Sequence, residues 1–283
     1  MELERPATSA LIRLLREAGR AKPRSIGFGR DREDGKQALP MVLVAELPGL
    51  DPEAAAAAVK AGAMAVSFAV DAATASTLGS GAVLDAAVKA CGEAAPGLSF
   101  SPDAAIGVDL PEIVAQAGID FLVAPVQRAP ASLLTTERLA KIPLVDASQP
   151  AALIRAIGDM DVDALCVAPP RRRRNAADLT VYDLMHYRGV AELARPPIMV
   201  VAEQAIRGAD LQALRDVGVD GIVVPLRKFE STAAAAAELE SMKTAIGTVR
   251  ITRKSDRARG DVLLPRVAAS AVPAAGDDDD DDE

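Results

Sequence analysis

Aromatic residues are scarce in this 283-residue chain, which contains five Phe, two Tyr and no Trp. Half of the residues are nevertheless apolar, so the hydrophobic core has to be built from Val, Ile, Leu and Ala. This composition is typical of a parallel sheet that is buried on both faces and covered by alanine-rich helices.

Cysteine and histidine are also rare. Cys91 and Cys166 form no close-spaced motif, and His186 is the single histidine, so the sequence offers no zinc site. We interpret both cysteines as reduced, buried side chains. Gly-x-Ser-x-Gly and Walker motifs are absent, and no lysine ends an expected strand, which argues against a Schiff-base aldolase. The sequence does not identify a metal ion or a cofactor.

Long apolar runs are missing as well. The first residues carry several charges in place of the apolar segment of a signal peptide, and Lys60 interrupts the alanine-rich stretch. We therefore expect a cytoplasmic protein with no membrane partner. The net charge of -8 arises mostly from residues 277–283, which carry seven acids, and the remainder is close to neutral. Such a balance predicts no nucleic-acid partner.

Eight short apolar runs recur along the chain, and helix-like segments lie between them. Proline precedes Met41, Leu144 and Ile198 by one to three residues, while glycines such as Gly62 and Gly218 end the preceding helices of other runs. The expected strands are 41–47, 64–70, 98–102, 120–125, 143–146, 163–168, 198–202 and 221–225. Eight alternating strands and helices predict an α/β protein with a (β/α)8 TIM barrel over residues 41–246. An open, doubly wound sheet is the alternative, but the first turn lacks its glycine-rich loop.

Three further segments flank the barrel. Residues 1–40 contain an expected helix whose Leu11, Ile12, Leu14 and Leu15 share one side. Residues 247–267 read as a hairpin extension, and residues 268–283 as a disordered acidic tail. Because an isolated ribbon is marginally stable, we expect it to pack against the amino-terminal segment or against another subunit of a homo-oligomer.

One β-α-β unit carries a family resemblance. It runs through Ala202-Glu203-Gln204-Ala205-Ile206-Arg207, Asp210-Leu211 and Gly218-Val219-Asp220-Gly221-Ile222-Val223-Val224. It resembles the strand 7 to strand 8 region of phosphate-binding TIM barrels, a set that includes indole-glycerol-phosphate synthase, thiazole synthase and flavin-linked relatives. The resemblance implies the barrel fold. The family has glycines where this chain has Gln204, Ala205 and Pro225, and those glycines let backbone N–H groups approach a phosphate.

Charged residues close the expected strands, and the carboxyl ends of barrel strands are where active sites lie. Acids follow the odd strands, and we select Glu46, Asp146 and Glu203 as candidate catalytic carboxylates; Asp103 is the fourth acid. Basic residues follow three of the four even strands, whereas Asp71 follows the second strand; the candidate substrate-binding residues are Arg128, Arg171, Arg227 and Lys228. The alternative is that these charges cap helices and pair with one another around a solvated rim.

A basic loop after the sixth strand leads into a segment with both tyrosines and the histidine. Tyr182 and His186 are four residues apart and should share a helix face. The segment is either a lid over the mouth or a helix that uses its aromatic side chains for packing or for a subunit contact, and we favour the second interpretation.

Two functions follow from these observations. The chain either acts on or binds a small anionic metabolite at the strand ends, as a lyase or isomerase, or it is a non-catalytic barrel that serves as a scaffold or assembly subunit. The acids favour the enzyme, and the missing glycines favour the scaffold. A mouth that is open and has converging charges would support the enzyme.

Overall fold

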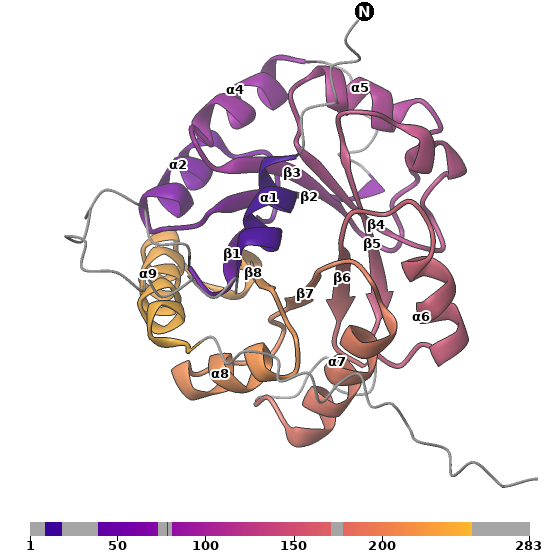
Figure 1. The fold of residues 1–283 in the computed structure, drawn as a ribbon. Coiled ribbons are helices and arrows are strands. Elements are labelled where there is room, and N and C mark those ends of the chain that lie inside the picture. Colours follow the sequence, from indigo (N-terminus) through magenta and orange to yellow (C-terminus); the bar gives the residue numbers. More distant parts are fainter. Residues whose placement is uncertain (1–8, 19–38, 73–77, 79–80, 171–177, 251–283) are drawn as a thin grey trace, which may run out of the picture. The chain divides into compact units, whose positions relative to one another are not determined.

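The computed structural model describes residues 9–18, 39–72, 78, 81–170 and 178–250. Within these residues, eight parallel strands form a closed barrel in which each strand pairs with its neighbours in sequence and the last strand pairs with the first (Figure 1). The strands are β1 (Val42–Leu47), β2 (Ala65–Val70), β3 (Ala95–Phe100), β4 (Phe121–Pro125), β5 (Ala140–Asp146), β6 (Leu165–Ala168), β7 (Ile198–Val201) and β8 (Gly221–Pro225). The predicted eight-stranded barrel is confirmed, although β3 and β5 begin earlier than expected.

Helices surround the barrel (Figure 1). The described α-helices are α1 (Ala10–Glu17), α2 (Pro52–Lys60), α4 (Ala82–Ala90), α5 (Leu110–Gln116), α6 (Ala151–Gly158), α7 (Val181–Leu193), α8 (Gly208–Asp216) and α9 (Thr232–Thr248); η2 (Ala131–Thr135) and η4 (Leu226–Lys228) are 3-10 turns. Their ends follow the sequence signals. The Asp51 carboxylate accepts hydrogen bonds from the first turn of α2, and Gly218 takes the left-handed conformation just after α8.

The interior of the barrel is a packed apolar core that α1 closes at the amino ends of the strands. Leu11, Ile12 and Leu15 of α1 are buried in the same cluster as Val42 and Val44 of β1. The predicted amino-terminal helix is therefore confirmed, with three of its four expected apolar residues buried. Figure 1 shows α1 lying across the ring of strands.

Asp120, the residue before β4, holds the first turn of α1. Its carboxylate accepts hydrogen bonds from the Ser9 hydroxyl at 2.7 Å and from the backbone N–H groups of Ala10 and Leu11 at 2.8 and 3.0 Å. A helix amino terminus has unpaired N–H groups and a partial positive charge, so an acid there stabilises the helix and fixes its position.

One connection of the barrel lacks an α-helix. The chain passes from β4 to β5 through η2 alone, where the hydroxyls of Thr135 and Thr136 both donate to the Ser132 carbonyl. Side chains that bond to local backbone in this way compete with a continuing helix. The sequence analysis expected a helix after every strand, and at this connection that expectation is wrong.

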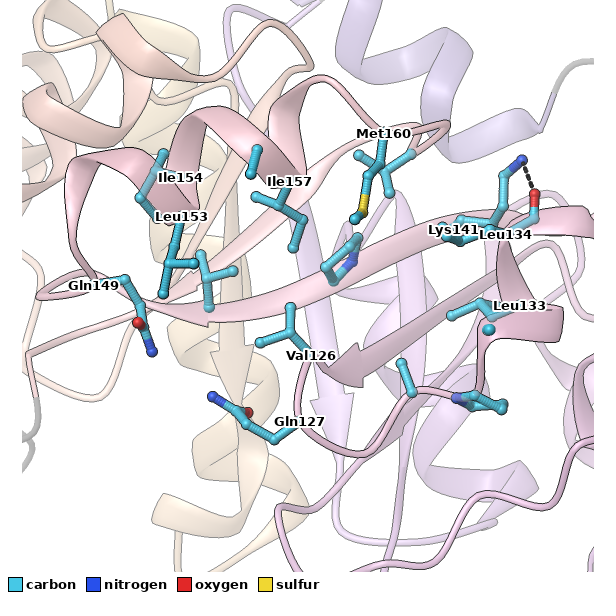
Figure 2. Close-up of a pocket in the computed structure, with 17 residues that line it drawn as sticks. Val126, Gln127, Leu133, Leu134, Lys141, Gln149, Leu153, Ile154, Ile157 and Met160 are labelled. Carbon is cyan, nitrogen blue, oxygen red and sulfur yellow. Dashed lines mark hydrogen bonds between the residues drawn. The ribbon is translucent and has the colours of Figure 1, made fainter.

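The missing helix leaves an apolar groove on the outer wall beside β5. The groove has a volume of about 380 Å³ and lies between η2 and α6 (Figure 2). Val126, Leu133, Leu153, Ile157 and Met160 line it, and Figure 2 shows their side chains gathered along the strand. Gln127 and Gln149 lie at one end, while Lys141 at the other end donates to the Leu134 carbonyl at 3.2 Å.

The carboxyl-terminal part of the barrel ends in α9. This helix continues to Thr248, so it includes the first two residues of the expected hairpin, Gly247 and Thr248. The rest of that hairpin from residue 251, and the acidic tail, lie outside the described residues. None of the helices in the described part of the chain is long and apolar enough to cross a membrane.

Candidate functional site at the mouth of the barrel

The carboxyl ends of the strands surround a cavity of about 290 Å³. Residues from all eight strands, or from the loops that follow them, line it: Val44, Glu46, Ser67, Ala69, Ser99, Phe100, Ser101, Pro102, Phe121, Val123, Leu144, Cys166, Ala168, Met199, Val201, Glu203, Val223 and Arg227. Most of these side chains are apolar and form the floor. The polar groups come from neighbouring strands: charged side chains lie at the ends of β7, β8 and β1, and serines lie at the ends of β2 and β3.

Arg227 joins two of the candidate acids. It lies in η4, directly after β8, and its Nη1 lies 2.7 Å from Glu46 Oε2 while its Nη2 lies 2.5 Å from Glu203 Oε1. The side chains of Glu46 and Glu203 are 11% and 23% exposed, whereas that of Arg227 is 48% exposed. The guanidinium therefore covers the two carboxylates from the open side of the mouth and reduces their mutual repulsion.

Lys228 follows in the same turn and also faces β7. Its ammonium group donates to the carbonyl of Ala202, the residue before Glu203. Burial lowers the pKa of Lys228 below its usual value, and the negative charge of Glu203 opposes this shift only in part. Lys228 does not line the cavity, so its role here is to hold the β7 and β8 loops together.

The other candidate residues lie apart from this group. Asp146 is buried, and its Oδ1 accepts hydrogen bonds from the backbone N–H and the hydroxyl of Ser148 at 2.9 and 2.5 Å, which orders the turn after β5. Arg128 donates to the Pro102 carbonyl at 3.2 Å. Neither lines the cavity, and nor does the exposed Asp103. Arg171 lies outside the described residues.

The structure adds three serines that the sequence analysis missed. Ser67 of β2, Ser99 of β3 and Ser101 just after β3 all line the cavity. Ser67 is 1% exposed, and its hydroxyl has no hydrogen-bond partner among the described residues; the Ser101 hydroxyl is also buried and unpartnered there. The available signal was a serine in the middle of each of two otherwise apolar strands, at Ser67 and Ser99.

Cys166 of β6 lies in the floor of the cavity. Burial raises the pKa of its thiol, and the negative charge of Glu46 raises it further. The side chain is thus a neutral thiol at physiological pH. It contributes to the apolar floor and is unsuited to act as a nucleophile, because the thiolate is the reactive form.

The aromatic segment of α7 serves packing in the described structure. The rings of Tyr182 and His186 meet edge to face with centroids 4.5 Å apart, so the predicted shared helix face is confirmed. His186 Nδ1 lies 3.0 Å from the Ala147 carbonyl, which ties α7 to the turn after β5. Neither aromatic side chain lines the mouth cavity.

The loop after β7 is filled where the resembling family has glycines. Gln204 is 4% exposed, and Ala205 forms a parallel bridge with Asp178. A buried side chain and an engaged backbone leave less room for a phosphate than glycines would. In the described part of the chain, no three His, Cys, Asp or Glu side chains are grouped closely enough to hold a metal ion.

Comparisons with known proteins bear on the fold. No protein-family model matches the sequence, and the curated proteins give no significant match. Among solved structures, thiamine phosphate pyrophosphorylase from Pyrococcus furiosus matches with a TM-score of 0.52 and 14% identity over 73% of this chain and 95% of that chain. Tryptophan synthase from Mycobacterium tuberculosis matches with a TM-score of 0.56 and 19% identity over 73% and 92%.

A mutant tryptophan synthase alpha-subunit from Pyrococcus furiosus matches with a TM-score of 0.52 and 16% identity over 72% of this chain and 98% of that chain. The chain is a TIM barrel. At these identities the likeness establishes the fold alone. What this TIM barrel does has to be argued from the residues at its own mouth.

Proposed function

We propose that this TIM barrel is an enzyme of the lyase or isomerase kind that acts on a small anionic metabolite at its mouth. One observation carries the proposal: Glu46 and Glu203, from strands on either side of β8, converge on Arg227 at the edge of an open cavity. Two largely buried carboxylates that share one cation next to a cavity are typical of functional sites, which makes this group a candidate site.

Arg227 supplies the anion-binding part. A guanidinium group has five N–H donors, and the two bonds to Glu46 and Glu203 leave three for a ligand. The side chain is about half exposed, so a carboxylate or phosphate group can reach it from solvent. A planar guanidinium is well suited to binding such groups with two parallel hydrogen bonds.

Glu46 and Glu203 supply the acid-base part. When a ligand anion takes up donors of Arg227, either carboxylate is free to accept a proton from the bound molecule. The apolar floor, which includes Phe121, Val123 and Met199, receives the carbon skeleton. At about 290 Å³ the cavity lies at the small end of ligand sites, which suits a metabolite of a few carbon atoms.

The test is a thermal-shift screen followed by proton exchange. Small carboxylic acids and phosphate esters should raise the unfolding midpoint, because a ligand that binds the native state stabilises it. A binding compound should then exchange a carbon-bound proton for deuterium in D2O, as followed by NMR. Glu46→Gln and Glu203→Gln should slow the exchange by at least about 100-fold.

Glu240→Gln is the matched control, since Glu240 is exposed on α9 and does not line the mouth. It should leave binding and exchange unchanged. The enzyme proposal is wrong if compounds bind but neither mouth variant affects binding or exchange.

A second candidate function is that of an assembly subunit, and the outer groove favours it. Among the described residues, five of the eight exposed large apolar side chains lie between residues 153 and 185, on or next to α6 and α7, and two of them, Leu153 and Met160, line the groove of about 380 Å³. Exposed apolar surface of this kind is typical of protein contacts. The proposed occupant is a second copy of this chain, which light scattering across a range of concentrations would detect as a rise in mass.

A further inference from the structure

The part of the mouth formed by β2, β3 and the residue after β3 carries hydroxyl groups and no charge. We call Ser67, Ser99 and Ser101 the serine wall; all three line the cavity, and the hydroxyls of Ser67 and Ser101 are buried with no partner among the described residues. An unpaired buried hydroxyl costs free energy, because it has given up its hydrogen bonds to water. A ligand group that bonds to it recovers this cost.

The charges around the cavity define which group fits the serine wall. Among the described residues that line the cavity, Arg227 is the one cation, and it lies directly after β8. A phosphate or carboxylate against the serines would be buried without a counter-charge, which is unfavourable. An uncharged oxygen has no such penalty and accepts hydrogen bonds from hydroxyl groups.

We infer that the serine wall binds a carbonyl oxygen of the substrate, and that the substrate is therefore a small oxo acid. Its anionic group lies against Arg227, its carbonyl oxygen against the serine wall, and its carbon chain on the apolar floor. This inference rests on the proposed function and specifies its substrate class.

The strand register connects this subsite to the chemistry. Glu46 and Ser67 are Cα partners in the parallel pairing of β1 with β2, and both side chains face the cavity. A carbonyl held by Ser67 therefore has its neighbouring carbon close to Glu46. The Glu46 carboxylate takes a proton from that carbon, the C–H electrons form a C=C bond, and the carbonyl electrons move to the oxygen. The resulting enolate oxygen is stabilised by the serine hydroxyls.

The experiment compares acids that differ only in the carbonyl. Binding of 2-oxopentanoate, 4-oxopentanoate and pentanoate is measured by calorimetry on the full chain. At least one oxo acid should bind about 3- to 10-fold more tightly than pentanoate, which is the range expected for one or two added hydrogen bonds. The preferred oxo acid should also exchange protons next to its carbonyl with D2O.

Ser67→Ala and the double variant Ser67→Ala/Ser101→Ala remove the hydroxyls and should abolish the preference, while pentanoate binds as before. Both variants should fold, and their unfolding midpoints without ligand should be equal to or above that of the wild type, because an unpaired buried hydroxyl is lost. Ser132→Ala, which removes an exposed hydroxyl outside the mouth, is the control.

The outcomes separate the inference from the proposed function. The inference alone is wrong if the double variant still prefers an oxo acid over pentanoate while Glu46→Gln abolishes proton exchange. It is also wrong alone if pentanoate binds the wild type as tightly as both oxo acids. In either case the serine wall does not select the substrate. If none of the three acids binds the wild type, the inference falls, and a phosphate ester that binds in the thermal-shift screen would leave the proposed function standing.

Discussion

The ring of Phe121 on β4 occupies the space into which a side chain at Gly97 on β3 would project. The two residues are Cα partners in the parallel pairing of β3 with β4, and both lie in the barrel interior. The other interior positions nearby are small, such as Ala65, Ala95 and Ala140. A single large ring beside a glycine thus fills the centre of a barrel that has few aromatic residues.

Gly97→Ala should therefore destabilise the barrel. A Cβ atom at this position overlaps the Phe121 ring, and overpacking in a core costs about 1 to 3 kcal/mol or more. Denaturant unfolding measures the loss. In the background of Phe121→Leu, which leaves room for the added methyl group, the same substitution should cost less.

Gly189→Ala is the matched control for this prediction. Gly189 lies inside α7, and a Cβ atom there meets nothing within 4 Å. Alanine should stabilise the chain by about 0.5 to 1 kcal/mol, because glycine is unfavourable in the middle of a helix. Equal losses at both positions would contradict the packing argument.

Arg227→Met should weaken the fold as well as ligand binding. The variant leaves Glu46 and Glu203 without the cation between them, and we expect a loss of about 1 to 2 kcal/mol in the free energy of unfolding. Combining the variant with Glu46→Gln and Glu203→Gln should recover part of it.

Both cysteines should resist thiol reagents in the native protein. Burial raises the pKa of Cys91 from 9.0 to about 11, which lowers its thiolate fraction at pH 8 by about 100-fold, and burial with the Glu46 charge raises the pKa of Cys166 as well. Reaction with dithiobisnitrobenzoate at pH 8 should be slow natively and complete in guanidinium chloride. Rapid native reaction of both thiols would contradict their burial.

The same shifts predict how stability depends on pH. The pKa values of both thiols are higher in the folded chain than in the unfolded chain. As the pH rises, the thiols of the unfolded chain therefore ionise first. The contribution of the two thiols to the free energy of unfolding is present in full below the unfolded pKa near 9 and decreases above it. Replacing both cysteines with alanine should flatten this alkaline decrease in unfolding experiments.

Leu153→Asp should reduce self-association if copies of the chain meet at the outer groove. Leu153 lines the groove, and a charge there opposes burial of the surface. Val83→Asp is the control, because Val83 is also 57% exposed but lies on α4. Sedimentation velocity should show a shift toward lower mass for Leu153→Asp alone. An equal effect of both substitutions would point to another contact surface.

Local sequence signals predicted the barrel because they act within one or two elements. Apolar runs gave the strands, and glycine and proline positions such as Gly218 and Pro52 gave the helix ends. The absence of an α-helix between β4 and β5 was not predicted. There the hydroxyls of two threonines donate to a nearby backbone carbonyl, and whether such bonds form depends on the conformation of the turn.

The site was predicted only in part, since side-chain direction depends on barrel closure. Glu46, Glu203 and Arg227 meet because their strands are neighbours in the closed sheet. Asp146 also ends its strand, but a serine two residues later offers both a hydroxyl and a backbone N–H, and the carboxylate turns to them. Ser67 carries no charge, so the charge pattern did not mark it as a candidate. Its place at the cavity follows from the direction of its side chain in the closed barrel.

The contact between Ser9 and Asp120 has a consequence for the order of assembly. The two residues are 111 positions apart, and the Leu15 side chain reaches the start of β8 at Gly221. Because α1 precedes these strands in the chain, it cannot dock until the strands that receive it have been synthesised. Its docking joins residues that are far apart in sequence, and contacts of this kind form slowly because a long loop has to close first.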